Sequence, residues 1–134
     1  MFTVEEIKDS SVLKELVDAS GIDEEFNYEA DIYHVGIKDG KIVGVIVYVL
    51  EQFNNGEYVP RFIHVIFDES IKRSKNIVIL LIKSQRMLAS LGYKQMFCLI
   101  EDRKQQMITY AKKFGFEEWN TTEHGKYLYK NIGE

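Results

Sequence analysis

Hydrophobic and polar positions along the first half of the chain mark β-strands. Two of the runs are joined by Asp39-Gly40, a dipeptide typical of a tight hairpin. The second run, 42–50, is almost entirely apolar, which indicates a central strand covered on both faces. A third apolar run follows Asn54-Asn55-Gly56 and is its antiparallel neighbour. The predicted strands are 2–7, 34–38, 42–50 and 61–67.

Helical periodicity marks three further segments. After the capping sequence Asp9-Ser10-Ser11, apolar residues share one helical face up to a stop at Gly21. The strongest stripe runs over 77–91 and ends at Gly92, and a shorter one over 107–114 ends at Gly115. Residues 23–33 are acidic and aromatic without a clean period, so they predict a short helix or a loop.

The remaining pattern completes a single domain over 1–134. Residues 94–100 form a buried strand between the last two helices, and 119–132 form a closing hairpin with a turn at His124-Gly125. The chain contains no internal repeat and no linker. Strands interleaved with helices in this order predict an α/β (α+β) fold.

Composition narrows the class of protein. With 134 residues, 46% of them apolar, the chain is long enough for one well-packed core. A net charge of −4 argues against nucleic acid as a partner. The charged N-terminus and the lack of a long apolar run predict no secretory signal, no membrane span and a cytoplasmic location. The single cysteine, Cys98, lies in an apolar segment and is expected in the core.

The order of elements, together with the phrase Lys112-Lys113-Phe114-Gly115-Phe116-Glu117 at the end of the last helix, resembles the GNAT superfamily of N-acetyltransferases. The resemblance implies a mixed, mostly antiparallel sheet of six to seven strands flanked by helices, with splayed strands near the fourth and fifth. It also implies acetyl-CoA as co-substrate. The acetyl group would pass by direct attack in a ternary complex to an amine on a small molecule or a protein.

In this family a loop of the form Arg/Gln-x-x-Gly-x-Gly/Ala holds the pyrophosphate of acetyl-CoA. The matching turn here contains no glycine. One register places Lys72, Lys75 and Ile77 at the three motif positions, and a register one residue later places Arg73, Asn76 and Val78 there. The helix N-terminus and its basic residues still suit a phosphate, whereas the alternative is a solvated turn capped by Ser74. The residues expected to bind the cofactor are Phe67, Lys72, Arg73, Ser74, Lys75, Asn76 and Ile77.

The family often uses a tyrosine to protonate the departing thiolate. That position is Ala111 here, so the adjacent Tyr110 is the candidate acid, with a packing aromatic as the alternative. His64 is the candidate base because its side chain alone on that strand titrates near neutrality, with a structural histidine as the alternative. Glu51 and Glu57 are further bases that would act through a water. The histidines and Cys98 lack metal-ligand spacing, so no metal site is expected.

The acidic and aromatic segment over 23–33 is a candidate acceptor site for a cationic amine. Its alternative is an acidic surface loop whose aromatic residues are buried. A non-catalytic interaction protein that has lost cofactor binding is the rival to the enzyme, because Lys75, Ile77, Lys104 and Ala111 replace residues common in the family. The trailing hairpin allows a homodimer. The segment's residues are Asp23, Glu24, Glu25, Phe26, Tyr28, Glu29, Asp31 and Tyr33.

Overall fold

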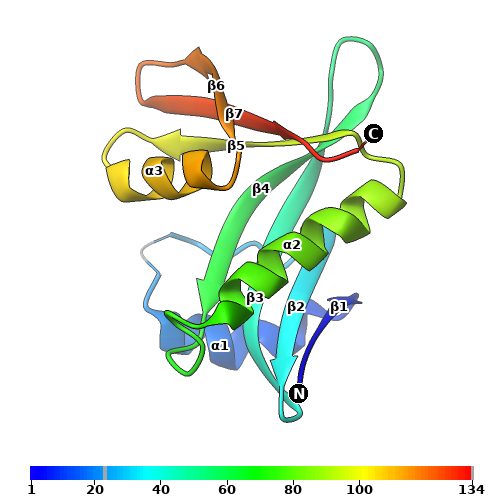
Figure 1. Ribbon diagram of the computed structural model, residues 1–134, viewed down its shortest axis with the longest axis vertical. Coiled ribbons are helices and arrows are strands. Elements are labelled where there is room, and N and C mark those ends of the chain that lie inside the picture. The colour runs from blue at the N-terminus through cyan, green and yellow to red at the C-terminus, as the bar shows by residue number, and fades with distance from the viewer. Residues whose placement is uncertain (23, 134) are drawn as a thin grey trace.

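The computed structural model describes residues 1–22 and 24–133 of the protein (Figure 1). Its strands and helices follow the predicted order. They are β1 (Phe2–Ile7), the 3-10 helix η1 (Ser10–Leu13), α1 (Lys14–Ser20), β2 (Ile32–Lys38), β3 (Lys41–Gln52), β4 (Tyr58–Phe67), α2 (Lys75–Ser90), β5 (Gln95–Glu101), α3 (Gln105–Lys113), β6 (Glu117–Thr121) and β7 (Gly125–Asn131).

The strands form one seven-stranded sheet in the order β1-β2-β3-β4-β5-β7-β6. Every neighbouring pair is antiparallel except β4 and β5, which are parallel and are connected through α2. The predicted mixed, mostly antiparallel sheet flanked by helices is therefore confirmed. In Figure 1, β4 and β5 diverge from a crossing point near their beginnings.

Backbone turns lie where the sequence predicts them. Asp39 and Gly40 both have positive φ angles, 53° and 78°, as a type I′ hairpin requires. The three helices end at residues in the left-handed region, Gly21, Gly92 and Gly115, with φ of 65°, 99° and 95°. The predicted hairpin and helix ends are thus confirmed.

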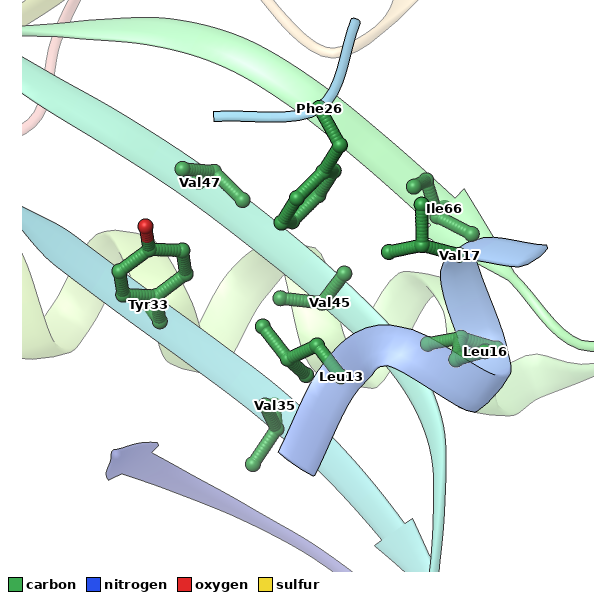
Figure 2. Packing of buried hydrophobic residues seen from close by; sticks show 9 residues of the cluster. All are labelled: Leu13, Leu16, Val17, Phe26, Tyr33, Val35, Val45, Val47 and Ile66. Atoms are coloured by element: carbon green, nitrogen blue, oxygen red, sulfur yellow. The ribbon is translucent and has the colours of Figure 1, made fainter. Parts of the chain in front are cut away.

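Helices cover both faces of the sheet. On one face, η1 and α1 pack Leu13, Leu16 and Val17 against β2, β3 and β4, and Figure 2 shows this cluster closing over Val45. On the other face, α2 buries Leu80 and Leu88 against the sheet. α3 lies on that same side, where Ile108 contacts β5 and β7.

The segment before β2 is an irregular loop rather than a helix. Residues 24–31 contain no helix, and Asp23 lies outside the described residues. The Phe26 ring is buried in the α1-side core and stacks on His64 with a centroid distance of 4.8 Å. Because this segment is held by contacts with β4 and not by its own backbone pattern, its conformation has no periodic signal in the sequence.

A buried polar group lies beneath α2. The Ser84 hydroxyl is 2.6 Å from Nδ1 of His34 and 2.8 Å from the Tyr48 hydroxyl. His34 Nε2 has no hydrogen-bond partner among the described residues. Burial lowers the pKa of His34 to about 4, so the ring is neutral at pH 7. These contacts tie α2 to β2 and β3.

Candidate functional site

The parallel strands β4 and β5 meet at one register pair, Arg61 and Phe97. Beyond this pair the two strands separate, and we call the region between them the splay (Figure 1). The register of β4 against β3 shifts opposite Val47 and Tyr48, which leaves Ile63 as an extra residue in β4. Such a bulge increases the local bend of a strand, so it turns β4 away from β5 just after the crossing.

The splay leaves one edge of β4 unpaired. From Phe62 to Phe67, β4 is paired with β3 on one side and with no described strand on the other. Backbone N–H and C=O groups along such an edge are available to an extended ligand. The edge can therefore bind a chain that carries amide groups, as an added strand would.

A turn lies where β4 ends. It runs from Asp68 to Ser74 and leads directly into α2. Its first two residues are acidic, and its basic part, which we call the basic turn, lies within the predicted basic stretch 71–77. Ile71 is fully buried and anchors the turn, and its Cδ1 would lie 3.4 Å from a Cβ on Gly44, so a small residue in β3 leaves room for it. The turn is thus held in place from its middle.

The glycine-free turn does contain a residue with a glycine-like conformation. Arg73 has φ of 66°, in the left-handed region that side chains rarely adopt. Lys75 begins α2, and Ile77 lies in its first turn. Neither has positive φ. The two motif positions that lack glycine are therefore helical, and the residue with an unusual dihedral angle lies just before them.

Internal hydrogen bonds occupy part of the α2 N-terminus. The Ser74 hydroxyl accepts from the Asn76 N–H at 3.2 Å and donates to the Ile71 carbonyl at 2.7 Å. The Ile77 N–H donates to the Ser74 carbonyl at 3.4 Å. Ser74 is therefore the helix cap, as one of the two interpretations of the sequence predicts. The N–H groups of Asn76 and Ile77 are therefore both used within the turn.

The charges of the turn are exposed. Lys72 pairs with Glu69 at 2.8 Å, and the Arg73 and Lys75 side chains are also on the surface. Phe67 is half-buried and packs in the α2-side core. The structure therefore brings all seven residues expected to bind the cofactor to the end of β4 and the start of α2.

Tyr110 lies on the exposed side of α3, with 52% of its surface accessible. Its hydroxyl accepts a hydrogen bond from Gln106 Nε2 at 3.2 Å, and the Lys113 ammonium lies 5.9 Å from the ring centroid. Ala111, the position where the family's tyrosine would stand, is half-buried against Ile108 and its neighbours. The phenol is thus accessible to a proton acceptor from solvent.

His64 lies on the α1 side of β4 and is only 7% exposed. The Asn27 N–H donates to its Nε2 at 3.2 Å, so Nδ1 carries the ring hydrogen and donates to Glu24 Oε1 at 3.1 Å. Both ring nitrogens are therefore engaged. The structure does not bring His64 and Tyr110 together, because α3 covers the opposite face of the sheet.

The structure also shows where the remaining titratable candidates lie. Glu51 is paired with Arg61 at 2.5 Å beside the strand crossing, and Glu57 is exposed at the start of the β4 segment. Cys98 is buried on the α3 side, and burial raises the pKa of its thiol to about 12, which disfavours a nucleophile. Among the described residues, no group of three His, Cys, Asp or Glu side chains could hold a metal ion.

The predicted acceptor segment supports both of its interpretations in part. Phe26 and Tyr33 are buried in the core, as expected for a surface loop with tucked aromatic residues. Residues 25–29, however, line a cavity of about 460 Å³ that includes the exposed ring of Tyr28 and two glutamates.

No helix in the described residues is long and apolar enough to span a bilayer.

Comparison with known proteins identifies the fold. An acetyltransferase of the GNAT family from Streptococcus pneumoniae matches with a TM-score of 0.77 and 14% identity, over 99% of this chain and 100% of that one. The ribosomal-protein-S18-alanine N-acetyltransferase of Escherichia coli matches with a TM-score of 0.74 and 12% identity, over 100% and 96%. Arabidopsis thaliana Naa50, solved in complex with the bisubstrate analogue CoA-Ac-MVNAL, matches with a TM-score of 0.76 and 14% identity, over 97% and 98%.

These matches show that the chain has the GNAT acetyltransferase fold from end to end. No protein-family model and no curated protein sequence matches it. At this level of identity the shared feature is the fold, and the activity must be argued from the chain's own residues.

Sequence reasoning missed two features of the site. The left-handed Arg73 has no local signal, because arginine is not a residue that favours positive φ. The buried anchor Ile71 lies among polar residues in a turn, where an apolar residue has no periodicity to mark it. Packing of Ile71 next to Gly44 of β3, a contact between distant parts of the chain, gives the anchor its role.

Proposed function

We propose that the protein is an acyl-CoA-dependent N-acetyltransferase. The observation that carries this proposal is the divergence of β4 and β5 after Arg61 and Phe97, with the basic turn and the α2 N-terminus at the end of β4. An unpaired strand edge that leads to a basic helix N-terminus suits a ligand with amides at one end and phosphates at the other. Acetyl-CoA has this layout.

Binding would use the seven residues at the end of β4. The pantetheine arm would pair with the β4 edge that ends at Phe67, and the pyrophosphate would lie against residues 72–77. Lys72, Arg73 and Lys75 would add charge-assisted contacts, which are stronger than neutral ones. The left-handed Arg73 supports this fit, because it gives the turn the type of backbone bend for which other loops use glycine.

The reaction is direct transfer between two bound substrates. The neutral amine nitrogen attacks the acetyl carbonyl carbon, a C–N bond forms, and the C–S bond to coenzyme A breaks. The amine gives up its extra proton to water or a base, and the thiolate gains one. N–H groups on the β4 edge are the donors for the carbonyl oxygen, and the exposed Tyr110 hydroxyl is the proposed acid.

The proton acceptor is proposed to be water, with His64, Glu51 or Glu57 as the protein groups that would assist. His64 can accept a proton at Nε2 only if the Asn27 N–H releases it. Glu51 can do so only if its contact with Arg61 opens. Water therefore has the easiest access. The acidic residues over 24–31 favour a cationic acceptor, either a small molecule or a protein amine, and we place the reaction in the cytoplasm.

A non-catalytic GNAT-fold protein is the second candidate. The observation that favours it is the internal cap of α2, in which Ser74 already accepts from the Asn76 N–H. A phosphate would compete with this bond. A homodimer through the β6–β7 hairpin would fit either function.

A crystal grown with acetyl-CoA tests the proposal. Density for the pyrophosphate at residues 72–77 and for the pantetheine along β4 is the expected result. An intact Ser74 cap with no cofactor in the splay, at a cofactor concentration that saturates a GNAT enzyme in the same conditions, would favour the second candidate.

A further inference from the structure

Aromatic rings from distant parts of the chain gather on one face of the C-terminal strands. Phe53 stacks on Trp119 with a centroid distance of 5.8 Å and meets the Phe97 ring at 5.4 Å. Tyr127 contacts Phe97 and Trp119 at 6.3 and 5.8 Å. We call Phe53, Phe97, Trp119 and Tyr127 the aromatic cluster.

The aromatic cluster lies on the face that α3 leaves uncovered. Cys98 and Leu128 pack against Ile108 of α3, and side chains alternate along a strand. Phe97 and Tyr127 therefore point to the opposite side. The Trp119 side chain there is 53% exposed. Phe53 and Tyr127 are half-buried and Phe97 is buried, so Trp119 is the exposed ring of the aromatic cluster on this uncovered face.

The face is hollowed rather than flat. Phe53, Phe97, Trp119 and Tyr129 line a cavity of about 320 Å³ together with Val59 and its neighbours. This volume lies at the low end of the range for small-molecule sites, roughly 300–1,000 Å³. It suits one ring or one branched chain, so a small ligand is a better occupant than a broad protein surface.

The cavity adjoins the closed end of the splay. Phe97 lines it and is also the β5 residue that pairs with Arg61 where β4 and β5 cross. Val59, two residues before Arg61, lines its β4 side. A ligand in the cavity therefore lies next to the place where the strands begin to diverge.

Charges near the cavity favour a cation. The Tyr129 hydroxyl donates to Glu117 Oε2 at 3.0 Å, which holds a carboxylate beside a lining ring. The Glu57 backbone carbonyl accepts from the Phe53 N–H at 2.9 Å, which closes the β3–β4 turn beside the cluster. Arg61 is already paired with Glu51. Aromatic faces also attract cations.

We propose that this cavity holds the apolar body of an amine whose ammonium group is attracted by Glu117. If this amine is the acetyl acceptor, the inference rests on the proposed function. The substrate class of the enzyme is then a small amine that carries a ring or a branched chain. The binding itself needs no coenzyme A.

Trp119 is the single tryptophan of the chain, so its fluorescence reports on this cavity. The experiment titrates the protein, without coenzyme A, with 2-phenylethylamine and follows the emission. Ethylamine and 2-phenylethanol are the control ligands, each lacking one of the two recognised parts. A saturable change with 2-phenylethylamine is expected, with at least about tenfold weaker binding of either control.

Two variants localise the signal. Phe53→Leu keeps an apolar side chain at the turn but removes the ring, and it is expected to weaken binding about tenfold. Phe2→Leu makes the same substitution in β1, away from the cavity, and is expected to leave 2-phenylethylamine binding unchanged. Glu117→Gln should weaken the binding of 2-phenylethylamine more than the binding of 2-phenylethanol.

Three results would overturn the inference: no saturable change at millimolar 2-phenylethylamine, equal binding by Phe53→Leu, or a Trp119 emission that instead follows protein concentration with a doubled mass in sedimentation. The last would make a second copy of the chain the occupant. Since coenzyme A is absent from the assay, failure here with intact acetyl-CoA binding rejects only the acceptor class. Success here without acetyl-CoA binding rejects only the transferase.

Discussion

Arg61 and Phe97 form the one register pair between β4 and β5 in the part of the chain that the structure describes. The pair lies near the start of both strands, so most of β4 is free on that side. The bulge at Ile63 follows within two residues and bends β4 away. One contact followed by a bend thus produces both an unpaired strand edge for a cofactor and, on the other side of Phe97, a wall of the aromatic cavity.

Reversing the charge of Lys72 is expected to weaken acetyl-CoA binding. In Lys72→Glu, a carboxylate replaces an ammonium beside the proposed pyrophosphate, and the loss should be about tenfold or more in the dissociation constant. Lys83→Glu, on an exposed part of α2 away from the turn, is the matched control. Calorimetric titration of both variants checks the assignment, and equal affinities would reject Lys72.

Two substitutions at Arg73 distinguish the effect of backbone strain on stability from the effect of charge on cofactor binding. Its left-handed φ penalises any residue with a Cβ, so Arg73→Gly should have a free energy of unfolding about 1 kcal/mol higher than Arg73→Ala. Both variants lose the same charge and should therefore bind acetyl-CoA equally weakly. Urea denaturation gives the stability difference. If alanine were as stable as glycine, the turn would not have the described conformation.

Much of the fold follows from local sequence patterns. Asp39-Gly40 fixes a hairpin because both residues tolerate positive φ, and Gly92 ends the helix over 75–90 for the same reason. The apolar stripe of α2 and the continuous apolar run of β3 each indicate their own burial. These signals depend only on neighbours in the chain, which is why they can be read without a structure.

The site follows far less directly. The splay depends on a register shift between β3 and β4, and Trp119 meets Phe53 only because the sheet brings distant strands together. His64 has the same side chain whether it is a base or a structural residue. Its partners, the Asn27 N–H and Glu24, come from a segment without any periodic pattern. Long-range contacts thus decide the roles of these residues.

Removing the Tyr110 hydroxyl tests the proposed acid. Tyr110→Phe is expected to lower kcat about tenfold and to leave acetyl-CoA affinity unchanged, because a thiolate is a fairly good leaving group. Thr109→Ala, its exposed neighbour on α3, is the control. Steady-state kinetics with an accepted amine gives the answer, and an unchanged kcat would show that another group or water protonates the thiolate.

The free energy of unfolding should decrease when the pH is lowered, because of His34. Its pKa is about 4 in the folded protein against 6.5 for an ordinary histidine, so the unfolded chain binds more protons between these values. Stability from this group is complete above pH 6.5 and falls on acidification towards pH 4. The loss reaches about 3 kcal/mol. Urea denaturation at several pH values measures it.

Two glutamine variants isolate this effect. His34→Gln should lose the pH dependence between 6.5 and 4.5, whereas His124→Gln, at an exposed histidine, should keep it. Carboxylates such as Asp68 protonate at lower pH in all three proteins and cancel in the comparison. An identical slope in His34→Gln would mean that another group causes the pH dependence.

Calorimetric titration with acetyl-CoA tests the central claim most directly. The account predicts saturable binding at one site per chain, with an affinity that Lys72→Glu reduces and that higher salt weakens, since the pyrophosphate contacts are ionic. An absence of binding heat at millimolar acetyl-CoA, confirmed at a second temperature, would contradict it. The protein would then have the GNAT fold without its cofactor.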